Sequence, residues 1–292
     1  MEFISTLING LSSGGTYAMI ALGYTMVYGI AKMLNFAHGD VIMVGGYMMY
    51  VAMYTAGQNI FVGILSAILF CTLLGVLVER FAYRPLRGAS PLAVLITAIG
   101  VSYLLQSLAQ IIFGSGQKML MKLKINGALQ LGQLSIDYST IITLIVATVI
   151  MVSLSMFVKY TKTGRAMIAV SEDRDAARLM GVNVNFIIMI TFAIGSALAA
   201  VASFFMLMKS PSLNNTLGAM PGIKAFTAAV IGGIGSIPGA MVGGILLGVV
   251  EAISYKMPAI APYTDAIEFS ILIIILLVKP SGLLGKKRRE KV

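Results

Sequence analysis

A charged segment with the sequence SEDRDAARLMG, residues 171–181, separates two long apolar stretches of the chain. Helices favour an N-cap residue and acidic groups at their start, and a cation followed by glycine at their end. Ser171 is the expected N-cap, and Glu172 and Asp173 are the acidic residues of the first turn. Arg178 is the cation of the last turn, and Gly181 is the glycine that follows. The pattern predicts a helix over 172–180 that docks onto another protein, with an ordinary solvated loop as the alternative.

A second segment is rich in glycine and has a proline inside an apolar run. Glycines four residues apart let membrane helices pack backbone to backbone, which is one interpretation. The proline favours a helix break, and breaks inside a membrane line protein or a cavity, which is the other interpretation. The residues concerned are Gly232, Gly233, Gly235, Pro238 and Gly239.

The segment NFAHGD, residues 35–40, is a further break between two apolar runs. Polar groups near a membrane are costly and often functional. We expect His38 and Asp40 at the water interface, and prefer a structural or gating role for His38 over substrate contact. Asn35 and Gly39 are the better candidates for lining a path through the membrane.

The sequence does not contain the residues that several kinds of site require. One cysteine, Cys71, allows no disulfide within the chain, and one histidine argues against a multi-histidine metal site. The sequence contains no phosphate-binding loop of the Gly-Lys-Ser/Thr type, so the chain is not expected to hydrolyse ATP. We therefore expect no enzyme activity, no metal and no cofactor.

The composition is that of a membrane protein. Hydrophobic residues make up 58% of the 292 residues and charged residues only 11%, whereas soluble proteins carry about 25% charged residues. Because a helix needs about 20 apolar residues to cross a bilayer, the apolar runs predict an all-α bundle of about eight spans in one domain, 1–292. The spans are 11–31, 40–56, 60–80, 92–113, 138–158, 185–208, 239–254 and 266–279, with a short or re-entrant segment near 222–234.

The basic residues give an orientation. Most of the 21 lysines and arginines fall in the loops after the first, third and fifth predicted spans and in the tail 280–292. The positive-inside rule makes these parts cytoplasmic, including the loop 159–184 and the C-terminus. The basic tail is expected to contact anionic lipid headgroups rather than nucleic acid.

Charged residues near the ends of predicted spans are expected at the interfaces. Glu251 and Glu268 lie near the outer ends of their spans, where exposure to water or a docking partner explains them. Arg84 and Arg87 are interpreted as anchors that face the lipid.

Five stretches of the chain together resemble one family. They are MLNFAHGD (33–40), RPLRGASPLAVLI (84–96), TGRAMIAVSEDRDAARLMGVNV (163–184), FTAAVIGGIGSIPGAMVGGILLG (226–248) and KPSGLLG (279–285). The family is the integral-membrane permease of branched-chain amino acid ABC importers, of the LivH type, within the binding-protein-dependent transport system inner-membrane components. The resemblance covers nearly the whole chain.

The resemblance implies a coupling helix that contacts an ATPase. Permeases of ABC importers carry Glu-Ala-Ala, three residues and Gly on this helix, and here Asp175-Ala176-Ala177 precedes Gly181, so Asp replaces Glu. The coupling residues would be Gly164, Arg165, Glu172, Asp173, Asp175, Ala176, Ala177, Arg178 and Gly181.

The resemblance also implies the partners and the compartment. The partners would be a second homologous permease forming a heterodimer, two ATPase subunits and an extracytoplasmic substrate-binding protein, assembled in a bacterial inner membrane.

Other functions stay open at this point. A permease of the same family for urea, short amides or another amino acid would have the same features. An ion-driven secondary transporter would need acidic or histidine residues at mid-membrane, where few are found, and an intramembrane enzyme would need paired acids deep in a span.

Overall fold

The computed structural model describes residues 2–57, 59–123, 125, 127–131 and 134–285. The basic residues of the predicted tail from 286 onward lie outside this part. Within it the chain is mostly helical, with eleven α-helices. They are α1 (Glu2–Ala31), α2 (His38–Thr55), α3 (Ile60–Val78), α4 (Pro91–Phe113), α5 (Tyr138–Tyr160), α6 (Lys162–Glu172), α7 (Arg174–Leu179), α8 (Val184–Lys209), α9 (Ala219–Gly232), α10 (Ile237–Lys256) and α11 (Thr264–Val278).

Smaller elements connect the helices. Four helical turns occur, a π-turn η1 (Glu79–Tyr83) and the 3-10 turns η2 (Arg84–Leu86), η3 (Met121–Leu123) and η4 (Ala261–Tyr263). Two antiparallel pairs of short strands join β1 (Lys118–Met119) with β4 (Ser212–Leu213), and β2 (Ala128–Leu131) with β3 (Leu134–Asp137). The sequence patterns did not indicate these strands, which lie at one end of the bundle.

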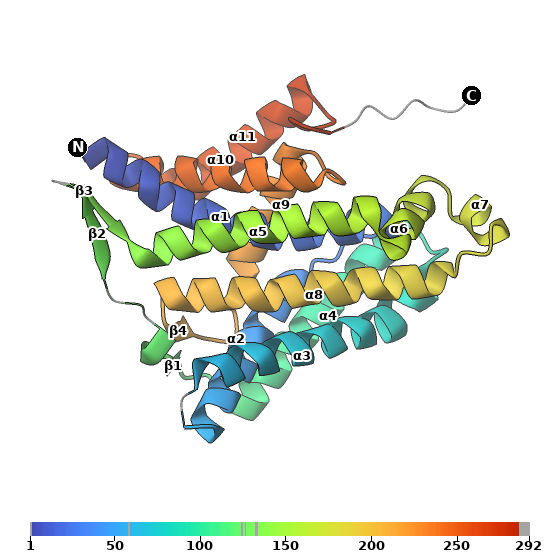
Figure 1. Cartoon of the computed structure of the whole chain (residues 1–292), viewed down its shortest axis with the longest axis horizontal. Coiled ribbons are helices and arrows are strands. Elements are labelled where there is room, and N and C mark those ends of the chain that lie inside the picture. Colours follow the sequence, from blue (N-terminus) through green and yellow to red (C-terminus); the bar gives the residue numbers. More distant parts are fainter. Residues whose placement is uncertain (1, 58, 124, 126, 132–133, 286–292) are drawn as a thin grey trace.

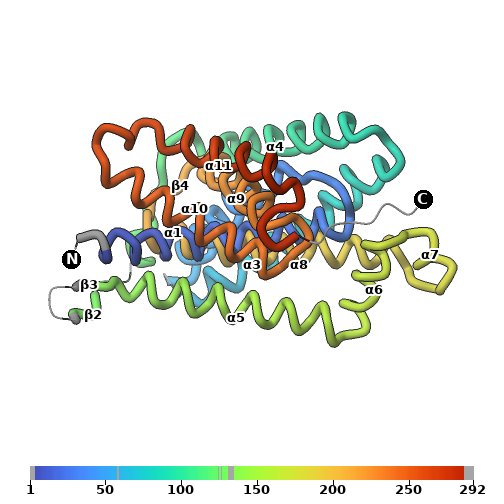
Figure 2. The backbone as a smooth tube through the Cα atoms, turned by 90° about the horizontal axis from the view of Figure 1, so that it is seen from above, coloured from blue at the N-terminus to red at the C-terminus, as the bar shows by residue number. Residues whose placement is uncertain are grey.

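The long helix α1 runs through the middle of the bundle. It packs against α10, α8, α5 and α9, and α3 packs on the far side of α8 (Figure 1). Seen from above, α4 and α5 lie at opposite edges, and α6 and α7 project from one end (Figure 2). The bundle therefore has an inner layer around α1 and an outer layer that includes α3, α4 and α5.

Six helical segments are long and apolar enough to cross a membrane, judged by length and composition: Ile60–Leu86, Pro91–Phe113, Tyr138–Tyr160, Val184–Lys209, Ile237–Lys256 and Ala261–Val278. They coincide with six of the eight predicted spans. The other two predicted spans correspond to α1 and α2, which are helical but less apolar because they carry glycine, serine, threonine and tyrosine. The count of about eight thus stays a prediction, and the run near 222–234 forms the short helix α9.

The helix starts follow ordinary capping chemistry. Ser90 accepts from the backbone N–H of Ala93 before Pro91 opens α4, and Ser236 does the same for Gly239 at the start of α10. A serine or asparagine side chain satisfies an N–H that has no partner within the helix. Proline suits the next position, because it lacks an N–H to satisfy.

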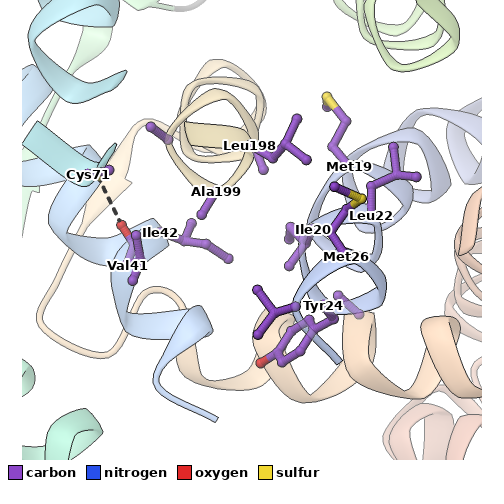
Figure 3. Close-up of a cluster of buried hydrophobic side chains, with 14 of the residues drawn as sticks. Met19, Ile20, Leu22, Tyr24, Met26, Val41, Ile42, Cys71, Leu198 and Ala199 are labelled. Atoms are coloured by element: carbon purple, nitrogen blue, oxygen red, sulfur yellow. Dashed lines mark hydrogen bonds between the residues drawn. The ribbon is translucent and has the colours of Figure 1, made fainter. Parts of the chain in front are cut away.

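The apolar core lies between α1, α2 and α8. Figure 3 shows Ile20 of α1 facing Ile42 of α2, with Met19 of α1 toward Leu198 of α8. These side chains are buried or nearly so. The inner helices are held by the same close packing that fills a soluble core.

Small residues bring three helices into backbone contact. A side chain added at Gly248 of α10 would meet Gly14 of α1, and one added at Gly243 would meet Ala228 of α9. Helix α10 therefore has two glycine faces, one for each neighbour. Glycines of α10 thus pack against the backbones of α1 and α9, as the spacing of four residues between glycines predicts.

Candidate functional site

The predicted docking helix is two helices in the structure. Helix α6 extends to Glu172, and α7 begins at Arg174. The N-cap is Asp173, whose carboxylate accepts from the backbone N–H groups of Asp175 and Ala176 at 2.9 Å. Ser171, predicted as the N-cap, lies inside α6 and donates to the carbonyl of Ile168. Both residue types can cap a helix, and the carboxylate is placed where α7 can use it.

The end of α7 agrees with the prediction. Gly181 adopts a left-handed conformation with φ of 82°. Its N–H donates to the carbonyl of Arg178, and the N–H of Val182 donates to the carbonyl of Ala177, both at 3.0 Å. This pair of bonds is a Schellman motif, which glycine permits without strain. Arg178 lies in the last turn and forms an exposed ion pair with Asp175 at 3.7 Å.

Not all of the predicted coupling residues are on the surface that α7 offers. Ala177 is buried against the protein itself, so only Ala176 of the two alanines is open to a neighbour. Glu172, which the sequence places in the same helix as Asp175 and Arg178, belongs to α6 instead. Leu179 and Met180 form the tip and are 89% and 84% exposed.

The segment α6–α7 is fixed to the bundle at two points. The guanidinium of Arg174 donates to the carbonyl of Ala31 at the end of α1. A side chain added at Gly164 would meet the backbone of Phe157 and Val158, so glycine allows α6 to turn closely back on α5. Arg165 is exposed on α6. Arg174 thus links the start of α7 directly to the end of α1.

The glycine-rich segment forms the junction between α9 and α10. Gly232 ends α9, Gly233 and Gly235 take positive φ values of 105° and 93°, and Pro238 lies in the first turn of α10. Side chains added at Gly232 or Gly239 would each meet the other's backbone.

The same junction is completed by the end of the chain. The N–H groups of Leu283 and Leu284 donate to the carbonyls of Ile231 and Gly232, at 2.8 and 2.9 Å. The last carbonyls of a helix have no partner within it, so the segment KPSGLLG serves as a cap for α9.

The break NFAHGD lies inside the protein, contrary to the expectation of a water interface. Asn35, His38 and Asp40 are all buried. The Asn35 side chain accepts from the hydroxyl of Tyr83 at 2.8 Å, and Asp40 accepts from Gln106 at 2.9 Å. Protein groups take the place of water here, because α2 begins between α1 and α9 rather than at the surface.

His38 lies beside a small cavity. The cavity of about 10 Å³ is bordered by Asn35, His38, Tyr24 and Phe226 among others. The rings of Tyr24 and His38 meet edge to face, with 4.7 Å between centroids. Neither ring nitrogen of His38 has a hydrogen bond of good geometry to the residues that the structure describes. Gly39 lies away from this cavity and packs against Gly218 and Gly222.

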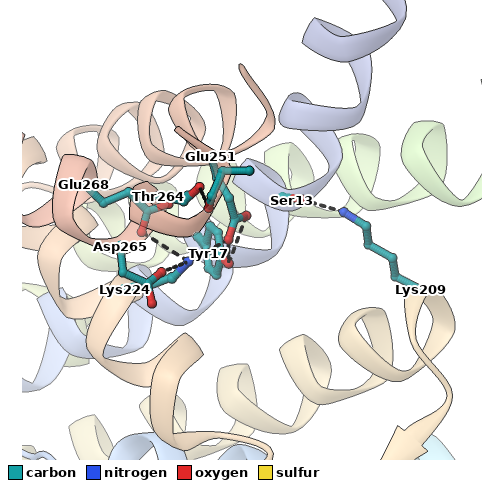
Figure 4. Close-up of polar contacts among 9 residues, drawn as sticks. Ser13, Tyr17, Lys209, Lys224, Glu251, Thr264, Asp265 and Glu268 are labelled. Atoms are coloured by element: carbon teal, nitrogen blue, oxygen red, sulfur yellow. Dashed lines mark hydrogen bonds and ion pairs between the residues drawn. The ribbon is translucent and has the colours of Figure 1, made fainter. Parts of the chain in front are cut away.

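A buried ion cluster was missed by the sequence patterns (Figure 4). The ammonium of Lys224 on α9 lies 2.7 Å from Glu251, 2.9 Å from Asp265 and 3.2 Å from Glu268. The hydroxyl of Tyr17 on α1 also donates to Glu251, at 2.9 Å. The cluster joins α1, α9, α10 and α11.

The interpretation that exposure explains Glu251 and Glu268 is therefore wrong. Both are buried, with 8% and 1% of their surface exposed. One available signal was Lys224 itself, a lone cation between the apolar residues of α9. A charge inside an apolar helix usually has a charged partner on another helix.

Arg87 is likewise not an anchor that faces the lipid. Its guanidinium pairs with the buried carboxylate of Glu79 and donates to the side chain of Asn185 at the start of α8. Glu79 opens the π-turn η1, and such turns reorient side chains within a helix. The loop between α3 and α4 is thereby tied to the base of α8.

Comparison with known proteins identifies the family. A family model described as branched-chain amino acid transport system / permease component matches residues 6–276. The chain is 42% identical to the high-affinity branched-chain amino acid transport system permease proteins BraD of Pseudomonas aeruginosa and LivH of Escherichia coli, with 100% of this chain and 98% of each relative covered.

A more distant relative carries a different name. The fructose import permease protein FruG of Bifidobacterium longum is 24% identical, over 98% of this chain and 91% of that protein. The match to the family model and the 42% identity both extend over nearly the whole chain. This chain therefore belongs to the family of branched-chain amino acid transport system permease components.

Proposed function

We propose that the chain is the membrane-embedded permease subunit of a bacterial inner-membrane ABC importer for leucine, isoleucine and valine. The observation that carries this proposal is the 42% identity to BraD and LivH over the full chain. The fructose permease FruG is only 24% identical, so the branched-chain substrates are favoured over another solute. The chain would act as one domain, 1–292, with its C-terminus in the cytoplasm.

The proposed assembly has five polypeptides. A second homologous permease would pair with this chain, two ATPase subunits would bind on the cytoplasmic side, and a binding protein would deliver the amino acid from outside. This division of labour is supported by the lack of any ATP-binding loop in the sequence.

The segment α6–α7 is the proposed coupling element. Its supporting features are the exposed tip of Leu179 and Met180, the rigid caps at Asp173 and Gly181, and the hydrogen bond from Arg174 to Ala31. Apolar side chains at a protein surface commonly mark a docking site. Movement of the ATPases would shift α7 and, through Ala31, the central helix α1.

The proposed path runs beside the junctions 35–39 and 232–239. The cavity near His38 is no larger than about one water molecule, so an amino acid would pass only after α1, α2 and α9 separate. Asn35, His38, Tyr24 and Tyr28 carry the polar groups that border the cavity. Gly39, Gly232, Gly233, Gly235, Pro238 and Gly239 would serve as close-packed hinges.

The coupling proposal is tested by cross-linking. In a Cys71→Ala background, Leu179→Cys should form a cross-link with the ATPase in the assembled complex. Phe186→Cys is the matched control, because Phe186 is an exposed apolar residue nearby, on α8. Cross-linking at Phe186 but not at Leu179, in an active complex, would contradict the proposal.

The substrate proposal is tested by uptake into proteoliposomes. Leucine uptake should require ATP, the ATPases and the binding protein together. Uptake driven by an ion gradient without these components would overturn the importer assignment, and uptake of fructose but not leucine would overturn the substrate.

A further inference from the structure

An open cavity of about 400 Å³, bordered by cations among mostly apolar residues, lies at the end of the bundle that carries α6 and α7. Its wall is formed by the end of α1, the loop between α3 and α4, and the start of α7. Three of its residues are cations, Lys32, Arg87 and Arg174, and none of its described lining residues is acidic. The cavity adjoins the small cavity beside His38, and Tyr28, Met33 and Leu34 border both.

Each cation is fixed by the fold. Lys32 has a positive φ of 53°, unlike every other non-glycine residue that the structure describes, and its ammonium donates to the carbonyl of Gly29. Arg174 donates to the carbonyl of Ala31. Strained backbone often occurs where a side chain must be held in one place.

Arg87 has a buried donor that no described residue satisfies. Its Nε is buried and has no hydrogen-bond partner among the described residues. Burial lowers the pKa of Arg87, and the neighbouring charges of Arg84 and Arg174 act in the same direction against the opposing effect of Glu79. Burial also lowers the pKa of Arg174. Glu79 opposes this effect at Arg87 and Asp175 opposes it at Arg174, so two carboxylates face the three cations Arg84, Arg87 and Arg174.

We propose that this cavity binds the phosphate of an anionic phospholipid. A phosphate group would balance the excess positive charge of the site and accept hydrogen bonds from the N–H groups of its arginines. The lipid source is favoured because apolar side chains surround the site. Phe81 and Leu92, which flank the loop between α3 and α4, are 73% and 63% exposed and can contact acyl chains.

The site would make the position of α7 depend on the lipid. The phosphate would be shared between Arg174 of α7, Arg87 of the α3–α4 loop and Lys32 at the end of α1. This role is independent of the transported substrate, so it does not rest on the proposed function.

The proposal is tested by native mass spectrometry of the full chain in the complex it forms, with phosphatidylglycerol as the probe. Lys32→Gln and Arg174→Gln should each weaken binding of the tightest phosphatidylglycerol about fivefold, from the contribution of one cation at a membrane surface. Arg174→Lys, which keeps the charge but not the fork of donors, should weaken binding less than Arg174→Gln does. The control Lys162→Gln removes an exposed cation outside the cavity, at the same end of the bundle, and should leave binding unchanged.

Further binding measurements identify the source of the phosphate. Phosphatidylcholine, which carries no net charge, should bind all variants alike. If millimolar inorganic phosphate displaces phosphatidylglycerol, the site accepts free phosphate as well, and if it does not, the lipid is the ligand. Equal phosphatidylglycerol binding by wild type, Lys32→Gln and Arg174→Gln would overturn the proposal, and Lys32, being exposed, can be replaced without loss of folding.

Discussion

At the scale of single residues, Lys224 holds the buried charges together. Its ammonium contacts three carboxylates, and the side chain of Glu268 is fully buried. Removing one member of a buried ion pair leaves an uncompensated charge in a medium of low dielectric constant. The cluster therefore fixes how α9 lies against α10 and α11.

Lys224→Met should lower the free energy of unfolding by about 3–5 kcal/mol, because Glu251 and Glu268 would then repel each other without a cation. Thermal unfolding in detergent measures this. Lys256→Met, which removes an exposed lysine of α10, is the control and should change stability little. Equal melting temperatures for both variants would show that the cluster contributes nothing to stability.

At the scale of elements, α7 depends on its N-cap. Asp173→Ala removes the acceptor for two N–H groups, which costs about 1 kcal/mol. Amide hydrogen exchange of Asp175 and Ala176 should then be about fivefold faster, since local opening would be easier. Ser171→Ala should leave these rates unchanged, because Ser171 lies in α6. Faster exchange in Ser171→Ala alone would restore Ser171 as the cap.

The packing of α10 on α1 gives a second prediction at this scale. Gly248→Leu should prevent assembly of the bundle, because the added side chain would overlap the backbone of Gly14. Gly100→Leu is the matched control in α4, where an added side chain meets nothing within 4 Å. The yield of monodisperse protein after detergent extraction compares the two, and similar yields would contradict the packing.

The sequence predicts the elements better than their contacts. The apolar runs locate the long helices, and the Gly181 stop is where it was expected. The sequence does not determine where α7 starts, because Ser171 and Asp173 are both good N-cap residues. Only the three-dimensional path of the chain decides between them. Glu251 lies twenty-seven positions from Lys224, so their pairing has no local signal.

In the candidate site, too, the sequence predicts which residues matter better than it predicts their contacts. The polar residues Asn35 and His38 could be singled out, because polar groups are rare in these apolar runs. Their burial could not be predicted from the sequence, because it depends on α9 covering the start of α2. Likewise, the cations Lys32, Arg87 and Arg174 are far apart in the chain and share one cavity only after folding.

At the scale of the whole molecule, the two ends of the bundle should face opposite sides of the membrane. The α6–α7 end carries Lys162, and the other end carries Lys256 at the end of α10. In a Cys71→Ala background, Lys256→Cys should react with an impermeant maleimide in intact spheroplasts. Lys162→Cys should react only after permeabilisation, and the reverse pattern would invert the proposed topology.

The cap that Leu283 and Leu284 place on α9 has a consequence for biosynthesis. The last carbonyls of α9 receive their partners from residues that leave the ribosome only after α10 and α11 have been made. Until then the junction at Gly232 is incomplete in a setting where unpaired backbone groups are costly. The helix hairpin of α10 and α11 is thus expected to insert before α9 settles, so the final step of folding is made by the end of the chain.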